Sequence, residues 1–169
     1  PRSLVVAPVS TLHNWAQEAR RFTPDLRVWV HHGPTRSTTL SQAEPAQADL
    51  IITSYATLLK DRAAFGDEPF MLVCLDEAQA IKNPRTRTAR VVRELEAQYR
   101  LALTGTPVEN SVSDLWSIID FLIPGLLGSH DRFKRTYRGA GSLRRDAQAS
   151  DTGRESRERL RRVVGPFIL

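Results

Sequence analysis

Residues 70–79 are Phe70-Met71-Leu72-Val73-Cys74-Leu75-Asp76-Glu77-Ala78-Gln79, an apolar run that ends in two adjacent acids. The apolar part is typical of a buried strand. In open α/β sheets ligands sit outside the carboxyl ends of the strands, so Asp76 and Glu77 stand where chemistry is expected. Buried unpaired carboxylates are costly, and a bound cation would offset that cost. For the tetrapeptide 76–79 alone, a strand that simply exits to solvent explains the pattern equally well.

Apolar runs alternate with helical patterns on both sides of this stretch. Strands are predicted over residues 3–7, 27–31, 49–53, 70–75 and 101–104, and helices over residues 10–22, 55–65, 85–99, 114–122 and 155–164. Ser10 is the predicted N-cap of the first helix. Near-continuous apolar strands separated by helices indicate a parallel sheet covered on both faces. The predicted fold class is therefore three-layer α/β, with a strand order that this pattern does not reveal.

Composition sets limits on the class of protein. The chain has 169 residues, 41% of them hydrophobic and 25% charged, which fits one ordinary domain with a core. No apolar run reaches the roughly 18 residues of a membrane span. The net charge of +5 comes mainly from arginine and suits a polyanionic partner, with a merely solvated surface as the alternative interpretation. For the arginine-rich helix near the C-terminus a solvated face is the favoured interpretation.

A second polar turn follows the last predicted strand, in the sequence Leu103-Thr104-Gly105-Thr106-Pro107. Gly105 permits a tight turn, and the two threonine hydroxyls can bond both carboxylates and a phosphate-bound water. In a parallel sheet this turn lies at the same edge as Asp76 and Glu77. It is a candidate relay between that site and its surroundings, with an ordinary turn as the alternative.

Two other strands end in hydroxyl residues that open a helix. The segments are Ala7-Pro8-Val9-Ser10-Thr11 and Ile52-Thr53-Ser54-Tyr55. Helix N-termini offer free N–H groups and partial positive charge, which bind phosphates. Two of them on one sheet edge could follow a sugar–phosphate backbone without reading bases. Plain N-capping is the alternative at each site.

Taken in order, these pieces resemble superfamily 2 helicase-like ATPases of the SWI/SNF kind. Segments 4–15 and 51–55 resemble motifs Ia and Ib, Leu75-Asp76-Glu77-Ala78-Gln79 resembles motif II in its DEAQ form, and segment 101–110 resembles motif III. The stretches 114–122, 124–128 and 166–169 resemble the segments that follow in that family. The DEAQ form is more typical of the bacterial members. The resemblance covers nearly the whole chain outside residues 138–154.

The resemblance implies a RecA-like lobe of the P-loop NTPase type that uses ATP and Mg²⁺ and acts on double-stranded DNA together with a second RecA-like lobe. It divides the chain into a partial first lobe (1–137), a flexible insertion (138–154) and the end of the lobe (155–169). Asp76 would hold Mg²⁺ through water, Glu77 would be the catalytic base, and Gln79 would sense the γ-phosphate. The implied coupling residues are Thr104, Gly105 and Thr106, and the implied DNA contacts are Pro8, Ser10, Thr11, Thr53, Ser54, Tyr55 and Lys82.

The chain departs from the family pattern at the phosphate loop, G-x-x-x-x-G-K-[ST]. The nearest loop, residues 33–38, lacks the spacing and the lysine. We therefore expect a fragment of a longer protein that hydrolyses ATP negligibly by itself. The rival hypothesis is a degenerate RecA-like module that binds nucleic acid or protein without ATP chemistry, and an RNA helicase is a third option. The expected location is the nucleoid in a bacterial cytoplasm, or the nucleus in a eukaryote.

Overall fold

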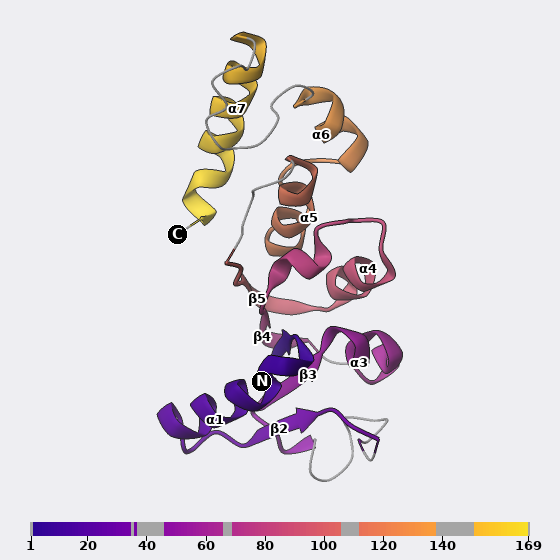
Figure 1. Ribbon diagram of the computed structural model, residues 1–169, viewed down its shortest axis with the longest axis vertical. Helices are drawn as coiled ribbons and strands as arrows, with labels where there is room; N and C mark the ends of the chain where they lie inside the picture. Colours follow the sequence, from indigo (N-terminus) through magenta and orange to yellow (C-terminus); the bar gives the residue numbers. More distant parts are fainter. Residues whose placement is uncertain are drawn as a thin grey trace.

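The computed structural model describes residues 2–34, 36, 46–65, 69–105, 112–137 and 151–168. Within them, five parallel strands form one sheet in the order β2-β3-β1-β4-β5 (Figure 1). The strands are β1 (Ser3–Ala7), β2 (Val28–His31), β3 (Leu50–Ser54), β4 (Phe70–Leu75) and β5 (Ala97–Ala102). The predicted parallel sheet is confirmed.

Helices cover both faces of this sheet, as predicted (Figure 1). Helix α1 (Leu12–Phe22) packs on one face, where Leu12 and Ala16 join alternate residues of β1, β3 and β4 in one core. Helices α3 (Tyr55–Lys60) and α4 (Arg87–Glu94) pack on the other face in a larger core. Short 3-10 turns lie at Val9–Thr11, Arg62–Phe65, Ala78–Ile81 and Gly165–Phe167.

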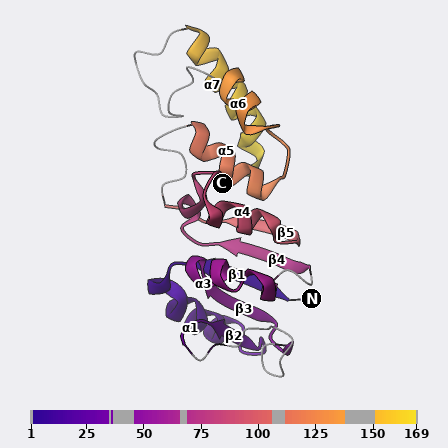
Figure 2. The ribbon, with the colours of Figure 1, turned by 90° about the vertical axis from the view of Figure 1, so that its right-hand side faces the viewer.

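Three helices extend the molecule beyond the β5 edge of the sheet (Figure 2). They are α5 (Val112–Leu122), α6 (His130–Thr136) and α7 (Asp151–Val164). They share a third core that includes Trp116, Phe133 and Leu160. The sequence patterns did not predict α6, and α7 begins four residues before its predicted start, so the insertion predicted over 138–154 is helical at its end. None of the described helices is long and apolar enough to cross a membrane.

The predicted helix over residues 85–99 was wrong in its second half. Helix α4 ends at Glu94, and β5 begins at Ala97. Glutamate, glutamine and arginine at positions 96, 98 and 100 favour a helix, but Ala97 and Tyr99 pair in register with Phe70 and Leu72 of β4. Completion of the sheet therefore overrides local propensity.

The first two predicted helices also differ from the structure, one at its start and the other at its end. The helix predicted from Ser10 begins as the 3-10 turn and becomes α-helical at Leu12, and its N-cap residue, Thr11, makes no side-chain capping bond. The helix predicted over 55–65 is α-helical only to Lys60.

The carboxyl ends of four strands meet at one edge of the sheet. Ala7 is in register with Ser54, and Leu75 is in register with both Val6 and Ala102. The polar segments that follow β1, β3, β4 and β5 therefore start side by side. This confirms that the acids after β4 and the threonine turn after β5 share one edge.

Candidate active site

The two acids occupy a tight turn directly after β4. The Asp76 amide still donates to the Val6 carbonyl of β1 at 2.8 Å, so Asp76 leaves the sheet in a fixed position. Glu77 has φ 51° and ψ 53°, in the left-handed region. That conformation costs a non-glycine residue on the order of 1–3 kcal/mol and is concentrated at functional sites. The turn thus holds Glu77 in a geometry that an ordinary strand exit would not adopt.

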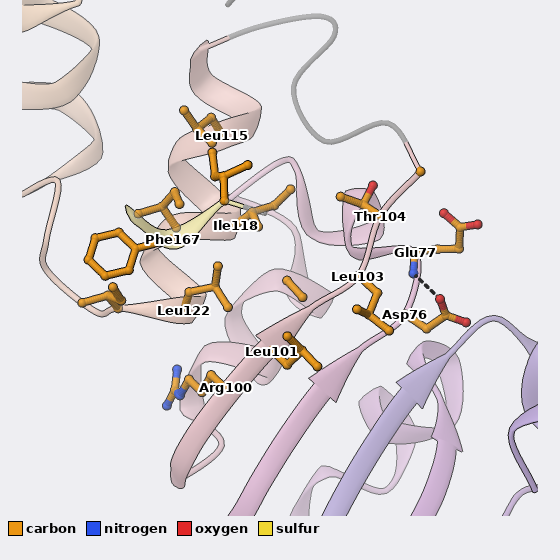
Figure 3. Close-up of a pocket in the computed structure, with 15 residues that line it drawn as sticks. Asp76, Glu77, Arg100, Leu101, Leu103, Thr104, Leu115, Ile118, Leu122 and Phe167 are labelled. Carbon is orange, nitrogen blue, oxygen red and sulfur yellow. Dashed lines mark hydrogen bonds between the residues drawn. The ribbon is translucent and has the colours of Figure 1, made fainter. Parts of the chain in front are cut away.

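Both oxygens of the Asp76 carboxylate accept hydrogen bonds. Oδ2 accepts from the Trp15 indole Nε1–H at 2.9 Å and from the Thr11 hydroxyl at 3.2 Å. Oδ1 accepts from the Glu77 amide at 3.0 Å (Figure 3). Hydrogen bonds to an ionised carboxylate are roughly twice as strong as neutral ones. The side chain of Asp76 is therefore oriented by α1 on one side and by its own turn on the other.

A chain of hydrogen bonds joins the second acid to the turn after β5. The Gln79 amide Nε2–H donates to Glu77 Oε2 at 2.6 Å, and the Thr104 hydroxyl donates to Gln79 Oε1 at 2.6 Å. The backbones are joined as well, because the Ala78 amide donates to the Leu103 carbonyl at 2.9 Å. Gln79 therefore links Glu77 with Thr104. A movement of the turn after β4 displaces a hydrogen-bonded partner in the turn after β5, and the reverse also holds.

The remaining residues of the threonine turn are only partly placed. Gly105 has no positive φ, and a Cβ there would meet no atom within 4 Å, so neither backbone nor space in the described residues requires glycine. The tight-turn argument for Gly105 is not supported. Thr106 lies outside the described residues. The coupling roles of these two positions stay predictions.

The segments predicted to contact DNA border this site, but their side chains differ in exposure. Ser10 is exposed, and Pro8 and Thr11 are half-buried. Thr53 and Ser54 are buried: the Thr53 hydroxyl donates to the His31 carbonyl at 2.9 Å, and Ser54 caps α3 by accepting from the Thr57 amide at 3.1 Å. As they lie here these two hydroxyls are used within the protein, so a DNA contact from this turn has to come from its backbone.

Tyr55 reaches the active-site turn from the other face of the sheet. Its hydroxyl donates to the Asp76 carbonyl at 2.7 Å. Burial, followed by the nearby Asp76 charge, raises the Tyr55 pKa well above its usual value, so the phenol keeps its proton. Lys82, the last predicted phosphate contact, is exposed just after the 3-10 turn that carries Gln79.

A groove of about 610 Å³ starts at the acids and runs along β5 toward the C-terminal segment (Figure 3). Asp76, Glu77 and Thr104 line one end, and Phe167 lies near the other. Arg100 also borders it, but its guanidinium donates to the Phe121 and Leu95 carbonyls at 2.8 and 2.7 Å and so ties β5 to its neighbours. The side chains that can bind a ligand are therefore those at the polar end of the groove, Asp76, Glu77 and Thr104.

The donor set fits Mg²⁺ better than a metal that needs several protein ligands. Among the described residues, no three or more His, Cys, Asp or Glu side chains cluster as a metal site. Mg²⁺ keeps most of its waters and is usually held by one or two carboxylates together with phosphate oxygens. Asp76, half-exposed at the rim, can supply such a carboxylate.

Sequence reasoning missed the roles of Trp15 and Tyr55 toward Asp76. Trp15 packs half-buried against the core under α1, and its N–H donates to the Asp76 carboxylate. The only available signal was its position four residues after Thr11, which places both side chains on one face of α1. Trp116, by contrast, is buried in the helical core formed by α5, α6 and α7.

An all-parallel sheet with paired acids after one strand and a threonine turn after its neighbour has the architecture of a RecA-like ATPase lobe. The comparison with protein families then specifies which kind. Residues 2–169 match the SNF2-related domain, and the chain belongs to that family. The predicted RecA-like fold and the resemblance to SWI/SNF ATPases are thereby confirmed.

Individual relatives agree with this assignment. The chain is 37% identical over 167 residues to the putative ATP-dependent helicase/translocase YwqA of Bacillus subtilis, and 36% identical over 172 residues to the TATA-binding protein-associated factor MOT1 of Saccharomyces cerevisiae. The aligned regions span 98% and 99% of this chain but only 17% and 9% of the length of these two proteins. The SWI2/SNF2 ATPase core of Sulfolobus solfataricus in complex with dsDNA matches with a TM-score of 0.83 and 40% identity, over 99% of this chain and 33% of that one. The chain is therefore homologous to part of an N-terminal RecA-like lobe, and the bacterial assignment stays a prediction.

Proposed function

We propose that this chain is part of the first motor lobe of an ATP-dependent translocase on double-stranded DNA, and that the whole protein hydrolyses ATP. The observation that carries the proposal is the continuous Glu77–Gln79–Thr104 hydrogen-bond chain at the carboxyl edge of the sheet. Hydrolysis needs an acid to act on water, and a motor needs that acid to be connected to a part that moves. Both requirements meet in these three side chains.

The residues divide the chemistry as follows. Asp76 would hold Mg²⁺, which when bound would supply charge neutralisation on the phosphate oxygens. Glu77 orients the attacking water and takes up its proton. Gln79, bonded to the Glu77 carboxylate, responds to the γ-phosphate and passes its presence to Thr104. The rest of the phosphate-binding machinery and the second lobe belong to other parts of the whole protein.

Double-stranded DNA is the proposed track. The Sulfolobus core was solved with dsDNA, the chain carries a net charge of +5, and Ser10 and Lys82 are exposed near the active-site edge. Contacts from Pro8, Thr11 and the backbone at Thr53 and Ser54 would complete a surface that follows the sugar–phosphate backbone, whereas the Tyr55 hydroxyl is already bonded to the Asp76 carbonyl. The proposed location follows from this track: the nucleoid in a bacterium, or the nucleus in a eukaryote.

A module that only binds nucleic acid or protein is less well supported. Such a module has no use for a strained Glu77 bonded through Gln79 to Thr104, and the relatives named above include an ATP-dependent helicase/translocase and an ATPase core. The motor is therefore the preferred function.

Glu77→Gln in the full-length protein tests the proposal. The substitution keeps the shape of the side chain and removes the base, so nucleotide affinity should stay within about twofold while DNA-stimulated phosphate release falls by at least about a hundredfold. Glu18→Gln, an exposed acid on α1 far in sequence from the turn, is the matched control and should leave both unchanged. Normal turnover by Glu77→Gln would remove Glu77 as the base, and stimulation of the wild type by RNA but not by duplex DNA would contradict the proposed track.

A further inference from the structure

Asp76 is held by side chains from two different helices. Trp15, in the first turns of α1, donates to its carboxylate at 2.9 Å, and Tyr55, the first residue of α3, donates to its carbonyl at 2.7 Å. Helices α1 and α3 pack on opposite faces of the sheet (Figure 1). The aspartate is thus fixed from both faces at once.

Trp15 and Thr11 both donate to Asp76 Oδ2, and the hydrogen bond from Trp15 has the more fixed direction. An indole has a single N–H and no acceptor, so its bond cannot be redirected by rotation of a hydroxyl. Thr11 also faces Oδ2, but its one hydroxyl hydrogen is shared between Asp76 at 3.2 Å and the Pro8 carbonyl at 3.1 Å. A carboxylate offers about four acceptor positions. Trp15, Thr11 and the Glu77 amide take three, so the remaining position for a metal-bound water is on Oδ1.

Both helices begin in the turns that face the proposed DNA surface. Trp15 lies about one helical turn beyond Thr11 and the exposed Ser10. Tyr55 directly follows Thr53 and Ser54 in the turn after β3. A rigid shift of either helix start therefore acts on Asp76 through one strong hydrogen bond, without any intervening residue.

We propose that Trp15 and Tyr55 are positioning residues that couple the two DNA-facing turns to Asp76, so that contact with DNA sets the orientation of the carboxylate that holds Mg²⁺. This inference rests on the proposed function and adds the route by which DNA regulates hydrolysis. Coupling of two binding free energies is reciprocal, so DNA should tighten the binding of Mg²⁺ by the same factor by which Mg²⁺ tightens the binding of DNA.

Trp15→Phe in the full-length protein tests the route, because it keeps an aromatic ring and removes the N–H. The ratio of ATP hydrolysis with saturating duplex DNA to hydrolysis without it should fall at least about fivefold, the lower end of usual coupling factors. The DNA dissociation constant should stay within about twofold. The Mg²⁺ requirement should no longer respond to DNA. In Tyr55→Phe, which keeps all three tryptophans, the DNA-induced change in tryptophan fluorescence, measured without nucleotide, should be smaller than in the wild type.

Trp116→Phe is the matched control. Its indole N–H also donates to an oxygen at 3.0 Å, the Gly128 carbonyl, but in the α5–α6 region and not at the acids. It should retain wild-type stimulation. If Trp15→Phe unfolds at a much lower temperature, Tyr55→Phe carries the test instead, since it removes only a hydroxyl and should lower the stimulation ratio in the same way.

The outcomes separate the two proposals. A wild-type protein that DNA does not stimulate would sink the DNA motor and this inference with it. A stimulated wild type with equal stimulation in Trp15→Phe and Tyr55→Phe would overturn the inference alone. Loss of stimulation through a weakened DNA dissociation constant would also overturn it, because the residues would then serve DNA binding and not coupling.

Discussion

Thr104→Val examines the link between Glu77 and the turn after β5. Valine has nearly the shape of threonine but no hydroxyl, so the substitution removes the 2.6 Å bond to Gln79 Oε1. This bond joins neutral groups in half-buried side chains and is worth about 1 kcal/mol. The Gln79–Glu77 bond is charge-assisted and should survive. Glu77 then keeps its hydrogen bond from Gln79, but Gln79 loses its hydrogen bond from Thr104.

The expected kinetic effect follows from that magnitude. If the full bond energy is used to orient Glu77 in the transition state, a loss of about 1 kcal/mol lowers kcat roughly fivefold, since 1.36 kcal/mol corresponds to tenfold. KM for ATP should change by less than about twofold, because the hydroxyl supplies orientation and not ground-state binding. The assay is steady-state phosphate release by the full-length protein with saturating duplex DNA.

Two controls isolate the hydroxyl of Thr104. Thr104→Ser keeps the donor and loses only a methyl group, so it should retain most of the wild-type kcat. Thr23→Val removes a threonine hydroxyl whose bond to the Ala19 carbonyl is also 2.6 Å long, at the exposed end of α1, and should leave kcat unchanged. The reasoning is refuted if Thr104→Val turns over at the wild-type rate, or if Thr104→Ser is as slow as Thr104→Val.

Two further predictions concern groups outside the acid pair. Burial raises the pKa of the Cys74 thiol to about 11, so at pH 8 it should react with iodoacetamide far more slowly in the native protein than in urea, and equal rates would show that the strand is open. The Asp61 carboxylate accepts hydrogen bonds from Arg36 and His31, and these bonds, the one from Arg36 above all, hold the pKa of Asp61 below its usual value. The contribution of Asp61 to stability is therefore present above about pH 4 and is lost as the pH falls further. Asp61→Asn should therefore lower the urea midpoint at pH 7 but have a smaller effect at pH 3, while the exposed Asp25→Asn should change neither, and a pH-independent loss would contradict the ion-pair argument.

The sequence predicted the strands best where an apolar run had only one interpretation. The predicted bounds of β1 and β4 agree with the structure, since continuous apolar residues fit only a strand covered on both faces. The prediction failed over 85–99 because β5 is not buried on both faces (Gln98, Tyr99 and Leu101 are exposed) and gains its stability from pairing with β4, which is not a property of its own sequence. The order of the strands was equally out of reach, because it depends on packing between segments far apart in the chain.

Within the site, sequence patterns could find residue types but not their partners. Asp76, Glu77 and the threonine turn were identified from their position after apolar strands and from the family resemblance. Hydroxyl residues at the start of a helix fit both capping and phosphate binding, and only the structure shows that Ser54 caps α3. The bond between Trp15 and Asp76 spans 61 positions, and a tryptophan on the apolar side of a helix reads as core.

The backbone of Glu77 explains why this turn is more than the end of a strand. Glutamate has no special preference for the left-handed region, and Glu77 is the one non-glycine residue among those described with a positive φ. The conformation lets the Ala78 amide reach the Leu103 carbonyl and the Glu77 amide reach Asp76 Oδ1. Together with the Gln79 bond these interactions offset a strain of about 1–3 kcal/mol. Two of the interactions that hold the strained turn come from Asp76 and Gln79, which are assigned to the chemistry, and the third connects the turn to the end of β5. The geometry of the acids and the connection to β5 therefore form one structural unit, and neither is expected to change without the other.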